Sequence, residues 1–563
     1  MSNKEKNAFA PAILREVKEG KYSAFEILYR AMRSEETRIL CEISTMTRRV
    51  QRTAGEVADR VDRLAASLEA GRRYGVLADG YDGLCALLAV LRSGSTAVLI
   101  DPLSAPEERA DRLATVNAAE MPMTESESTD AVADRAFGSE IILFTPAGEA
   151  VTLTGEMLAL ELLRVETLTG EKKGILSLGN APKLLLALPL HTGEGITALL
   201  WALALGAVTV YPTDPSAEAI LRSVRNHQTD LLIAPPYVYE ATERLLGQLI
   251  DGRDAKQREK YEKAMQKAGN GKAFRELHAH LLGTELSFCY CAGELRARTA
   301  TVLGALGHPV TELYGNVHGF LLYRKGTRYL PLAGIDATVE EERLTVREGD
   351  AVLSDRLDAI SEKEGIRLLG DRAHVAISEE GERIYAEQVE QLVDLPRVLE
   401  SAVLSVEGEH LLICRIPSDL LSVQKQSLNE RVRALREASP TLRRVLFTYA
   451  PLKSAGASAP DRDRLEAILS TLPTVSLDVT ATDAEDSEIR EALAEMFADI
   501  LGCATSEIDP DGHFMLDLGG NSLDYFTLVG EINERFGITL QFEGESFGYS
   551  LNDMERKVKE LIV

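Results

Sequence analysis

Residues 517–524 read Asp-Leu-Gly-Gly-Asn-Ser-Leu-Asp, and Ser522 is the side chain in this stretch best suited to chemistry. The serine follows two glycines, which allow a tight turn and leave room around the hydroxyl. After it, apolar residues recur at helical spacing, namely Leu523, Phe526, Val529, Ile532 and Phe536. Ser522 is therefore predicted at a helix N-terminus, where unpaired N–H groups and the helix dipole favour an attached phosphate. An ordinary capping serine is the alternative interpretation.

The segment around this serine is acidic and rich in helical patterns. Residues 484–563 hold 18 acidic and 5 basic side chains, a balance of −13, which is half of the net charge of −26 of the whole chain. An amphipathic helix is predicted at 489–501, and a loop rich in Gly, Asp and Pro follows. The helix after Ser522 is expected to break at Gly537, and a last amphipathic stretch covers 551–562.

A small acidic helical bundle with Asp-Leu-Gly-Gly-Asn-Ser before its second helix resembles the acyl/peptidyl carrier protein family. The resemblance covers 486–563 and implies an all-α four-helix carrier bundle. It also implies that Ser522 bears 4′-phosphopantetheine, which a separate phosphopantetheinyl transferase adds from coenzyme A, and that Asp517 is the aspartate of the motif. The thiol of the arm would hold a carboxylic or amino acid cargo as a thioester. The surplus of carboxylates fits docking on basic patches of biosynthetic partner enzymes.

Length, charge and cysteine usage limit the remaining possibilities. A chain of 563 residues is expected to form two to four domains. The net charge of −26 argues against nucleic acid as a partner. The longest apolar run, 196–211, is shorter than the roughly 20 residues of a membrane span. The six scattered cysteines, and an N-terminus without the apolar core of a signal peptide, predict a cytoplasmic protein. No metal site is indicated.

The region before the carrier segment has the sequence pattern of an α/β protein. Helical patterns alternate with short apolar strands, which predicts a parallel sheet. These strands are expected at 74–78, 96–100, 140–144, 184–188, 207–211, 230–234 and 286–290. The predicted domains are a large α/β domain at 1–370 and a small α+β domain at 371–470. Residues 471–485 are predicted to be a linker, because they combine Pro473, several Ser and Thr, and an acidic run.

Short motifs in this region follow the order found in the adenylate-forming (AMP-binding) family, which includes acyl-CoA synthetases and nonribosomal peptide adenylation domains. The chain resembles that family at 52–57, 91–102, 188–193, 292–295, 313–315 and 354–390. The resemblance implies an adenylate-forming fold that binds ATP and Mg²⁺. It implies that Asp355 is the ribose-binding aspartate, with His191 and Tyr314 as further residues of the nucleotide site.

Other positions depart from the family pattern. Residues 144–154 stand in place of the phosphate-binding loop, but they are shorter, lack its lysine, and add Glu149, a carboxylate that would repel a triphosphate. His318 stands where the family has a Mg²⁺-binding glutamate, and imidazole is a poor ligand for this hard ion. Asp371 replaces an arginine, and Ala457 replaces the catalytic lysine. These replacements argue against ATP and Mg²⁺ binding, and no residue is predicted to be catalytic.

Two functions follow from these patterns. The favoured one is a phosphopantetheine-dependent acyl or aminoacyl carrier fused to a degenerate, weakly active or inactive AMP-binding domain. It would tether a thioester intermediate in fatty-acid-like, polyketide or nonribosomal-peptide-type biosynthesis. The alternative is an active, ATP-dependent, AMP-forming acid–thiol ligase that loads its own carrier domain in cis. A structural protein with an unmodified Ser522 is the third reading.

Overall fold

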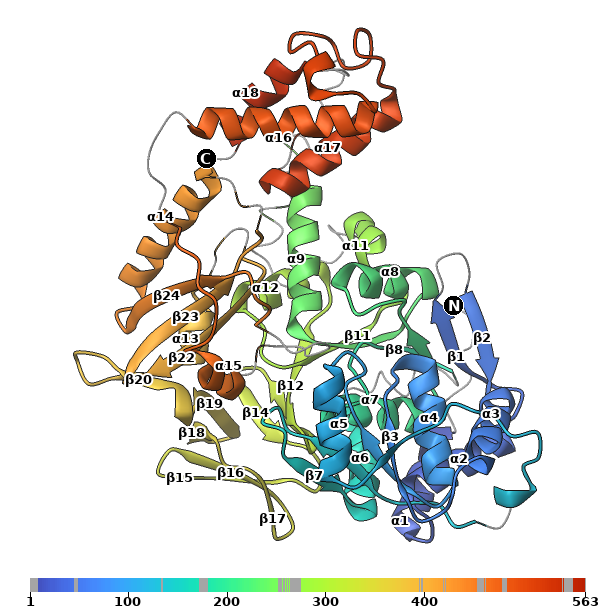
Figure 1. Ribbon diagram of the computed structural model, residues 1–563. Coiled ribbons are helices and arrows are strands. Elements are labelled where there is room, and N and C mark those ends of the chain that lie inside the picture. The colour runs from blue at the N-terminus through green and yellow to red at the C-terminus, as the bar shows by residue number, and fades with distance from the viewer. Residues whose placement is uncertain are drawn as a thin grey trace. The chain divides into compact units, whose positions relative to one another are not determined.

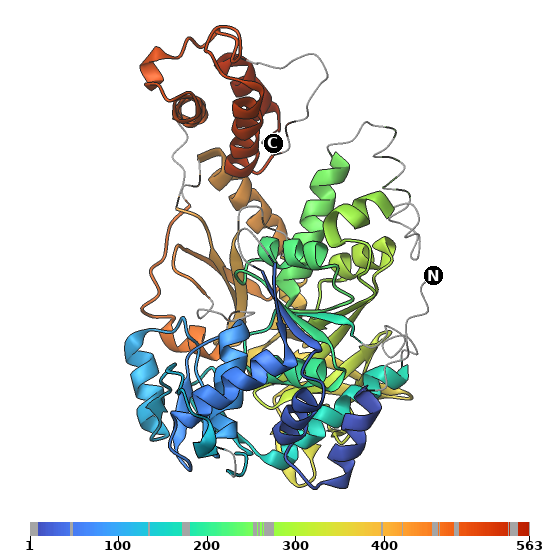
Figure 2. The same ribbon diagram turned by 90° about the vertical axis from the view of Figure 1, so that its right-hand side faces the viewer.

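The computed structural model describes residues 9–44, 49–132, 135–171, 181–251, 275–393, 398–418, 422–452, 462–477, 484–538 and 550–561, with the single residues 256, 259, 261, 263, 395, 420, 460 and 540. It consists of two compact units (Figures 1 and 2). Unit 1 comprises Met1–Leu246, Tyr261–Leu369 and Lys453–Arg464. Unit 2 comprises Gly247–Lys260, Gly370–Leu452 and Leu465–Val563.

A 14-stranded sheet has the strand order β15-β16-β18-β19-β14-β13-β12-β11-β10-β8-β9-β1-β2, with β17 paired to β16. Its strands are β1 (Ile39–Ser44), β2 (Arg49–Thr53), β8 (Lys183–Leu186), β9 (Val208–Tyr211), β10 (Leu231–Ala234), β11 (Phe288–Ala292), β12 (Val310–Asn316), β13 (Gly319–Lys325), β14 (Arg328–Pro331), β15 (Asp336–Glu340), β16 (Arg343–Glu348), β17 (Ala351–Ser354), β18 (Leu357–Glu362) and β19 (Gly365–Asp371). The run from β12 to β1 is parallel. Its carboxyl ends therefore lie at one edge, where α/β folds bind ligands.

A second sheet in unit 1 has the order β5-β3-β4-β6-β7. Its strands are β3 (Arg73–Val76), β4 (Thr96–Leu99), β5 (Ala119–Glu120), β6 (Ile141–Phe144) and β7 (Ala150–Leu153). The first four of these are parallel, and β7 returns antiparallel to β6. The α/β character predicted from the sequence is confirmed, and the observed strands lie within about two residues of the predicted ones.

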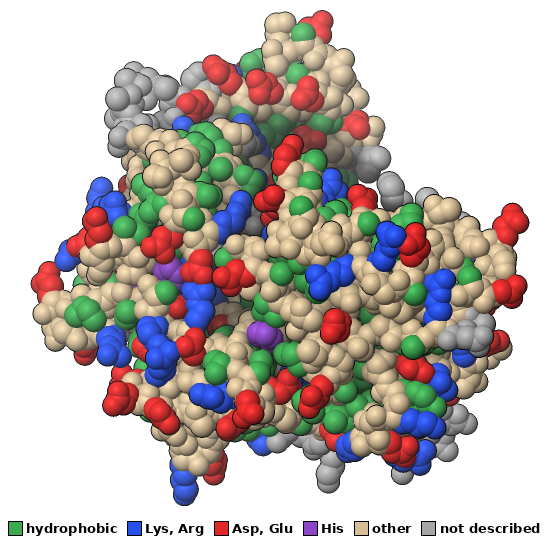
Figure 3. Space-filling model, turned by 60° about the horizontal axis from the view of Figure 1, so that its bottom comes forward, with side chains coloured by type: hydrophobic (Ala, Val, Ile, Leu, Met, Phe, Trp, Pro, Cys, Tyr) green, Lys and Arg blue, Asp and Glu red, His purple; other side chains and the backbone are tan. Residues whose placement is uncertain are grey.

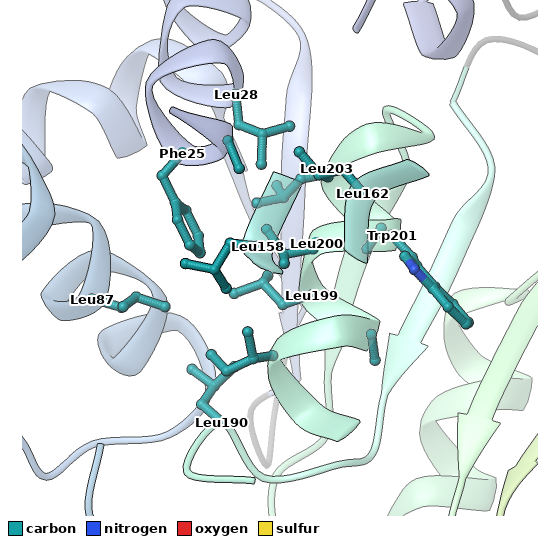
Figure 4. Packing of buried hydrophobic residues seen from close by; sticks show 14 of the residues in the cluster. Phe25, Leu28, Leu87, Leu158, Leu162, Leu190, Leu199, Leu200, Trp201 and Leu203 are labelled. Atoms are coloured by element: carbon teal, nitrogen blue, oxygen red, sulfur yellow. The ribbon is translucent and has the colours of Figure 1, made fainter. Parts of the chain in front are cut away.

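Helices pack against both sheets of unit 1. They are α1 (Phe9–Glu19), α2 (Ala24–Ser34), α3 (Ala54–Ala66), α4 (Gly80–Arg92), α5 (Pro106–Thr115), α6 (Gly155–Glu171), α7 (Gly193–Ala204), α8 (Ala217–His227), α11 (Arg275–Leu282) and α12 (Ala297–Leu306), with the 3-10 turn η1 (Asp130–Val132). Helix α9 (Pro236–Asp251) begins in unit 1 and ends in unit 2. Helix α7 is apolar around most of its circumference and nearly all of its residues are buried. Figure 4 shows Leu199, Leu200 and Trp201 of this helix in one cluster with Leu158 and Phe25 from α6 and α2.

Unit 2 holds a smaller α+β part and a helical part. The former contains β20 (Val375–Ile377), β21 (Arg383–Tyr385), β22 (Glu400–Val406), β23 (Glu409–Arg415), β24 (Leu442–Thr448), α13 (Ala386–Glu390), α14 (Ser422–Ala438) and the turn η3 (Arg372–His374). Helix α15 (Arg462–Ile468) crosses the division between the units. Strands β22, β23 and β24 form one sheet, in which Val403, Leu412 and Cys414 are completely buried.

The helical part comprises α16 (Ala484–Leu501), the 3-10 turn η4 (Thr505–Glu507), α17 (Ser522–Phe536) and α18 (Leu551–Leu561). It has an apolar core of its own, in which Phe497, Phe514 and Ile532 are fully buried. The predicted all-α domain is confirmed, although α16 begins five residues before the predicted start. Across the described helices of both units, we find none long and apolar enough to cross a membrane.

Candidate functional site

Asn521, rather than Ser522, caps helix α17. The Asn521 Oδ1 atom accepts a hydrogen bond from the N–H of Asp524 at 3.1 Å, and the N–H of Asn521 donates to Asp524 Oδ2 at 3.0 Å. This reciprocal pair is a capping box built from Asn and Asp. Ser522 is the first residue of the helix. The capping reading of the serine is therefore not supported, because Asn521 satisfies the cap.

Asp517 stabilises the loop that leads to this helix. Its Oδ2 atom accepts a hydrogen bond from the N–H of His513 at 2.9 Å, and the His513 Nδ1 atom accepts from the N–H groups of Met515 and Leu516, both at 3.2 Å. Asp517 is exposed and belongs to a turn of closely spaced backbone bonds. The structure thus places this aspartate as a support of the loop, five residues before the serine.

Gly520 occupies a position where a side chain cannot fit. A Cβ atom there would overlap the ring of Phe514. That ring is fully buried and packs edge-on against Phe497, with centroids 5.3 Å apart and an interplanar angle of 87°. Close packing of glycine on this ring fixes the path of the chain immediately before Ser522.

Two large apolar side chains near this serine in sequence remain exposed. Leu516 is 81% exposed and Phe526 is 48% exposed, whereas most apolar residues of the domain are buried. Large apolar side chains that remain exposed are candidates for contact with a partner. On the face drawn in Figure 3, acidic and basic side chains are interspersed.

In unit 1, the chain segments after β8 and at the end of β12 pack against each other. A Cβ atom at Gly193 would overlap the carbonyl oxygens of Asn316 and Val317, so the two turns touch through their backbones. Both strands belong to the parallel part of the sheet and end at the same edge. The segments that carry His191 and Tyr314 therefore lie next to each other.

Tyr314 and Asp355 lie near one another. The Tyr314 hydroxyl is 3.1 Å from Ser354 Oγ, and Asn316 Nδ2 donates to the Leu353 carbonyl at 3.0 Å. The carboxylate of Asp355 itself accepts from Arg343 Nη2 at 2.5 Å in an ion pair that is about half exposed. The carboxylate that the sequence motifs predict to bind ribose is thus already paired with Arg343.

His191 lies between two carboxylates without touching either. Its Nδ1 atom is 3.8 Å from Asp79 Oδ2, and its Nε2 atom is 4.0 Å from Asp101 Oδ2. Both distances exceed that of a hydrogen bond. The Nδ1 atom is buried and has no hydrogen-bond partner among the described residues.

His318 is held as a neutral imidazole. Burial, reinforced by the positive charge of Arg164, lowers the pKa of His318. Its Nδ1 atom is buried without a hydrogen-bond partner in the part of the chain that the structure describes. The next residue, Gly319, approaches Thr197 and Glu161 so closely that a Cβ atom would overlap both. The local packing therefore fixes this histidine where the family's acidic residue would stand.

A buried ionic cluster below His318 was not predicted from the sequence. Arg164 is 1% exposed and pairs with Glu161 and Glu348. The Thr197 hydroxyl donates to Glu161 Oε2 at 3.0 Å. Removing one member of such a buried pair would leave an uncompensated charge, which is strongly destabilising. Glu161 and Arg164 have the i,i+3 spacing of a helical ion pair, but the sequence does not indicate that the pair is buried or that Glu348 joins it.

Glu194 is the other residue that sequence reasoning missed. It lies in the first turn of α7, and a Cβ atom at Gly315 would be 3.0 Å from its Cγ atom. The side chain is partly buried, and this burial raises its pKa to about 7. An acidic residue between two glycines directly after His191 and Thr192 is the signal that could have identified it.

The segment in place of the phosphate loop is a closed hairpin between β6 and β7. Phe144 pairs with Ala150, and the Thr145 N–H donates to the Glu149 carbonyl at 2.8 Å. The Gly148 N–H donates to the Thr145 carbonyl at 2.8 Å, and the Glu149 N–H to Thr145 Oγ1 at 3.1 Å. The hairpin therefore uses these N–H groups internally.

The structure describes one of the two remaining replaced positions, Asp371. Asp371 Oδ1 accepts from the Ala373 N–H at 2.9 Å and so caps the turn η3 in unit 2. Ala457 lies outside the described residues.

Residues 491–543 match the family model described as a phosphopantetheine attachment site. An acyl carrier protein of Solidesulfovibrio magneticus is 36% identical over 55 residues, which are 10% of this chain and 70% of that protein. The chain belongs to the acyl carrier protein family. The carrier domain accounts for this membership, and it contains the capped helix α17 and the loop before it.

Solved structures resemble a much larger part of the chain. The adenylation and peptidyl carrier didomain of a carboxylic acid reductase from Segniliparus rugosus, solved with AMP, is 13% identical over 98% of this chain and 97% of that chain, with a TM-score of 0.59. A benzoate CoA ligase from Burkholderia xenovorans is 15% identical over 79% of this chain and 99% of that chain, with a TM-score of 0.56. The body in front of the carrier domain therefore has the adenylate-forming fold.

Proposed function

We propose that the chain is a phosphopantetheine-dependent acyl or aminoacyl carrier whose adenylate-forming body has lost most or all ATP-dependent activation. Ser522 would bear the arm, and the thiol of the arm would hold a carboxylic or amino acid as a thioester. The body would recognise the cargo or organise partner enzymes. In this proposal, residues 1–370 form the large domain, residues 371–470 form the small domain, residues 471–485 are the linker, and residues 486–563 are the carrier domain.

The assignment of Ser522 as the attachment site rests on the capping box of Asn521 and Asp524. It leaves Ser522 as the first helical residue, at the end of α17 where N–H groups and the dipole favour a phosphodiester. Asp517 and Gly520 fix the loop that presents this position. The match of 491–543 to a phosphopantetheine attachment site supports the same assignment. A phosphopantetheinyl transferase is then a required partner.

The residues at the unit 1 edge fit Mg²⁺·ATP poorly. A triphosphate needs N–H groups and cations, whereas the hairpin of 145–149 uses its N–H groups internally and exposes Glu149. Mg²⁺ needs oxygen ligands, whereas His318 supplies a neutral ring. Asp355 is paired with Arg343. These observations support the loss of activation in the second half of the proposal.

The second candidate is an active ligase that loads its own carrier in cis. The order of the two domains favours it, since the Segniliparus rugosus didomain that resembles nearly the whole chain was solved with AMP. In this reading, Tyr314, His191 and Asp355 would line a nucleotide site at the carboxyl ends of β8 and β12. Asp355 would have to leave Arg343 when the nucleotide binds.

Intact-mass measurement tests the role of Ser522. The full chain is expressed with a promiscuous phosphopantetheinyl transferase, and we expect a mass increase of one arm. Ser522→Ala should abolish the increase. Ser506→Ala is a matched control, because Ser506 is an exposed serine in the turn η4 of the same domain. An unmodified wild-type chain would refute the proposal.

Pyrophosphate exchange and calorimetry separate the two candidates. Exchange is measured with panels of fatty, aryl and amino acids, and Mg²⁺·ATP is titrated into the full chain. The proposal expects background exchange and no measurable heat of binding. Substrate-dependent exchange that Asp355→Ala removes would favour the ligase instead.

The exposed side chains of Leu516 and Phe526 suggest how partners would dock. They give the neighbourhood of Ser522 an apolar contact surface within an acidic domain. Partner enzymes with a basic rim around an apolar patch would match this chemistry.

A further inference from the structure

A hydroxyl, an imidazole and a carboxylate form a continuous hydrogen-bonded chain between β1 and α8 of unit 1. The Ser44 Oγ atom is 2.7 Å from His227 Nε2, and the His227 Nδ1 atom is 2.7 Å from Glu42 Oε2. Ser44 and Glu42 are two residues apart on β1, so their side chains lie on the same face of the sheet. His227 reaches them from the last turn of α8.

The burial of the three side chains is graded along this chain. Glu42 is 1% exposed and His227 is 2% exposed, whereas Ser44 is only partly buried and ends β1. The carboxylate and the imidazole are therefore shielded from water, and the hydroxyl is the member nearest to solvent. This is the order in which a buried acid orients a base toward an accessible nucleophile.

Glu42 is held as an anion. Burial acts to raise the pKa of Glu42, but hydrogen bonds from His227, Gln51 and Lys183 outweigh it and lower this pKa to about 2. The Lys183 Nζ atom is 3.0 Å from Glu42 Oε1, and the Gln51 Nε2 atom donates to the same oxygen at 2.8 Å. An ionised Glu42 must accept the Nδ1–H of His227. With the proton on Nδ1, the Nε2 atom accepts from the Ser44 hydroxyl.

We propose that Ser44 is an activated nucleophile that accepts acyl groups from esters or thioesters. The Ser44 proton passes to His227 Nε2 while Oγ bonds to the acyl carbon. The carbon–sulfur or carbon–oxygen bond then breaks, and the leaving thiol or alcohol takes the proton from His227. Water attacks the acyl-serine in the same way, which releases the carboxylic acid and restores Ser44. Neither Ser522 nor the nucleotide edge takes part in these steps.

The competing interpretation is purely structural. The same contacts would attach the β1–β2 hairpin to α8, and Lys183 would add a further link by donating to the His227 carbonyl at 3.0 Å. A structural hydroxyl has the reactivity of any other serine, so selective reaction with an electrophile distinguishes the two roles.

Labelling of the full chain with a fluorophosphonate tests the proposal. We expect a single-site adduct on the tryptic peptide 39–48, with fragment masses that place it on Ser44. Ser44→Ala should abolish this adduct, and His227→Gln should slow its formation by about 10²–10⁴-fold, the usual contribution of a general base. A hydrolytic burst with p-nitrophenyl acetate should disappear in the same variants.

Ser223→Ala is the matched control. The Ser223 Oγ atom lies 3.2 Å from Ser44 Oγ but is outside the path from Ser44 to His227 and Glu42. This variant should therefore still be labelled at Ser44, without the slowing of about 10²–10⁴-fold that is expected of His227→Gln. Circular dichroism and thermal midpoints establish that each variant is folded. The proposal is overturned if wild-type Ser44 stays unlabelled, or if a folded His227→Gln variant is labelled as fast as the wild type.

Discussion

At the scale of single residues, Asn521 caps helix α17, a role that a serine at a helix start often has. Asn521 and Asp524 satisfy the end of α17 in both directions. The sequence indicated a helix start here and left open whether Ser522 was its cap. The question depended on which of two adjacent side chains folds back on the helix, which the spacing of apolar residues does not determine.

The capping assignment predicts different effects of two neighbouring substitutions. Asn521→Ala should lower the free energy of unfolding of the carrier domain by about 1 kcal/mol, because a backbone N–H loses its partner. Ser522→Ala should change it by less than about 0.5 kcal/mol. Both changes in free energy are measured by denaturant unfolding of the full chain, monitored at the transition of the carrier domain. Equal effects of the two substitutions would show that the cap is shared.

Glu194 predicts a pH dependence of stability. Burial raises its pKa in the folded chain to about 7 from an ordinary value of 4.5, so the folded state binds the proton more tightly than the unfolded state. Wild-type stability should then fall as pH rises from 4.5 to 7, and stay low above it.

The Glu194→Gln variant has no ionisable group at this position, so its stability should not fall over this pH range. The variant should gain stability relative to the wild type across that range, by as much as about 3 kcal/mol at the upper end. Thermal midpoints of both proteins in a pH series provide the comparison. A constant difference between them would mean that Glu194 titrates normally.

At the scale of helices and strands, the elements that could be predicted from the sequence are those that produce a local pattern of apolar residues. The helices α16, α17 and α18 follow from apolar periodicity, and the short parallel strands from apolar runs between helices. The hairpin of β1 and β2 was missed. Strand β1 contains the buried Glu42, which interrupts its apolar run, and it pairs in parallel with β9, far away in sequence. Pairing at that distance leaves no local signature.

The candidate site shows the same difference between features with a local sequence pattern and contacts that no local pattern encodes. The motifs that contain His191, Tyr314 and Asp355 all lie in or after a strand, namely after β8, within β12 and directly after β17. The ion pair of Asp355 with Arg343 depends on side-chain contacts that no motif encodes. The early start of α16 has a local reason. Its first residues are acidic, which suits a helix N-terminus but also suits a linker.

The turn before α17 predicts a coupled pair of substitutions. Gly520→Ala should destabilise the carrier domain by about 1–3 kcal/mol, because the new methyl group meets the buried ring of Phe514. Adding Phe514→Leu should recover part of this loss, since the smaller side chain makes room. Unfolding curves of the two single variants and the double variant measure the coupling. Simple additivity would disprove the contact.

At the scale of the whole molecule, charge is distributed unevenly along the chain. Residues 484–563 carry −13 of the total of −26. If partners dock on this domain through basic patches, their association should be steered electrostatically and screened by salt. The rate of arm transfer to Ser522 should therefore fall several-fold as ionic strength rises from about 0.05 to 0.5 M. A time course of intact mass measures this rate, and a salt-independent rate would contradict docking by charge.

The hairpin of β6 and β7 also constrains how this chain could change over evolutionary time. Thr145, Gly148 and Glu149 have their N–H groups bound within the turn, and Pro146 has none. A substitution that introduces a lysine at this turn would supply a cation but would leave these N–H groups bonded within the hairpin. A phosphate-binding turn at this position would need additional residues, so it would arise by codon insertion rather than by point mutation.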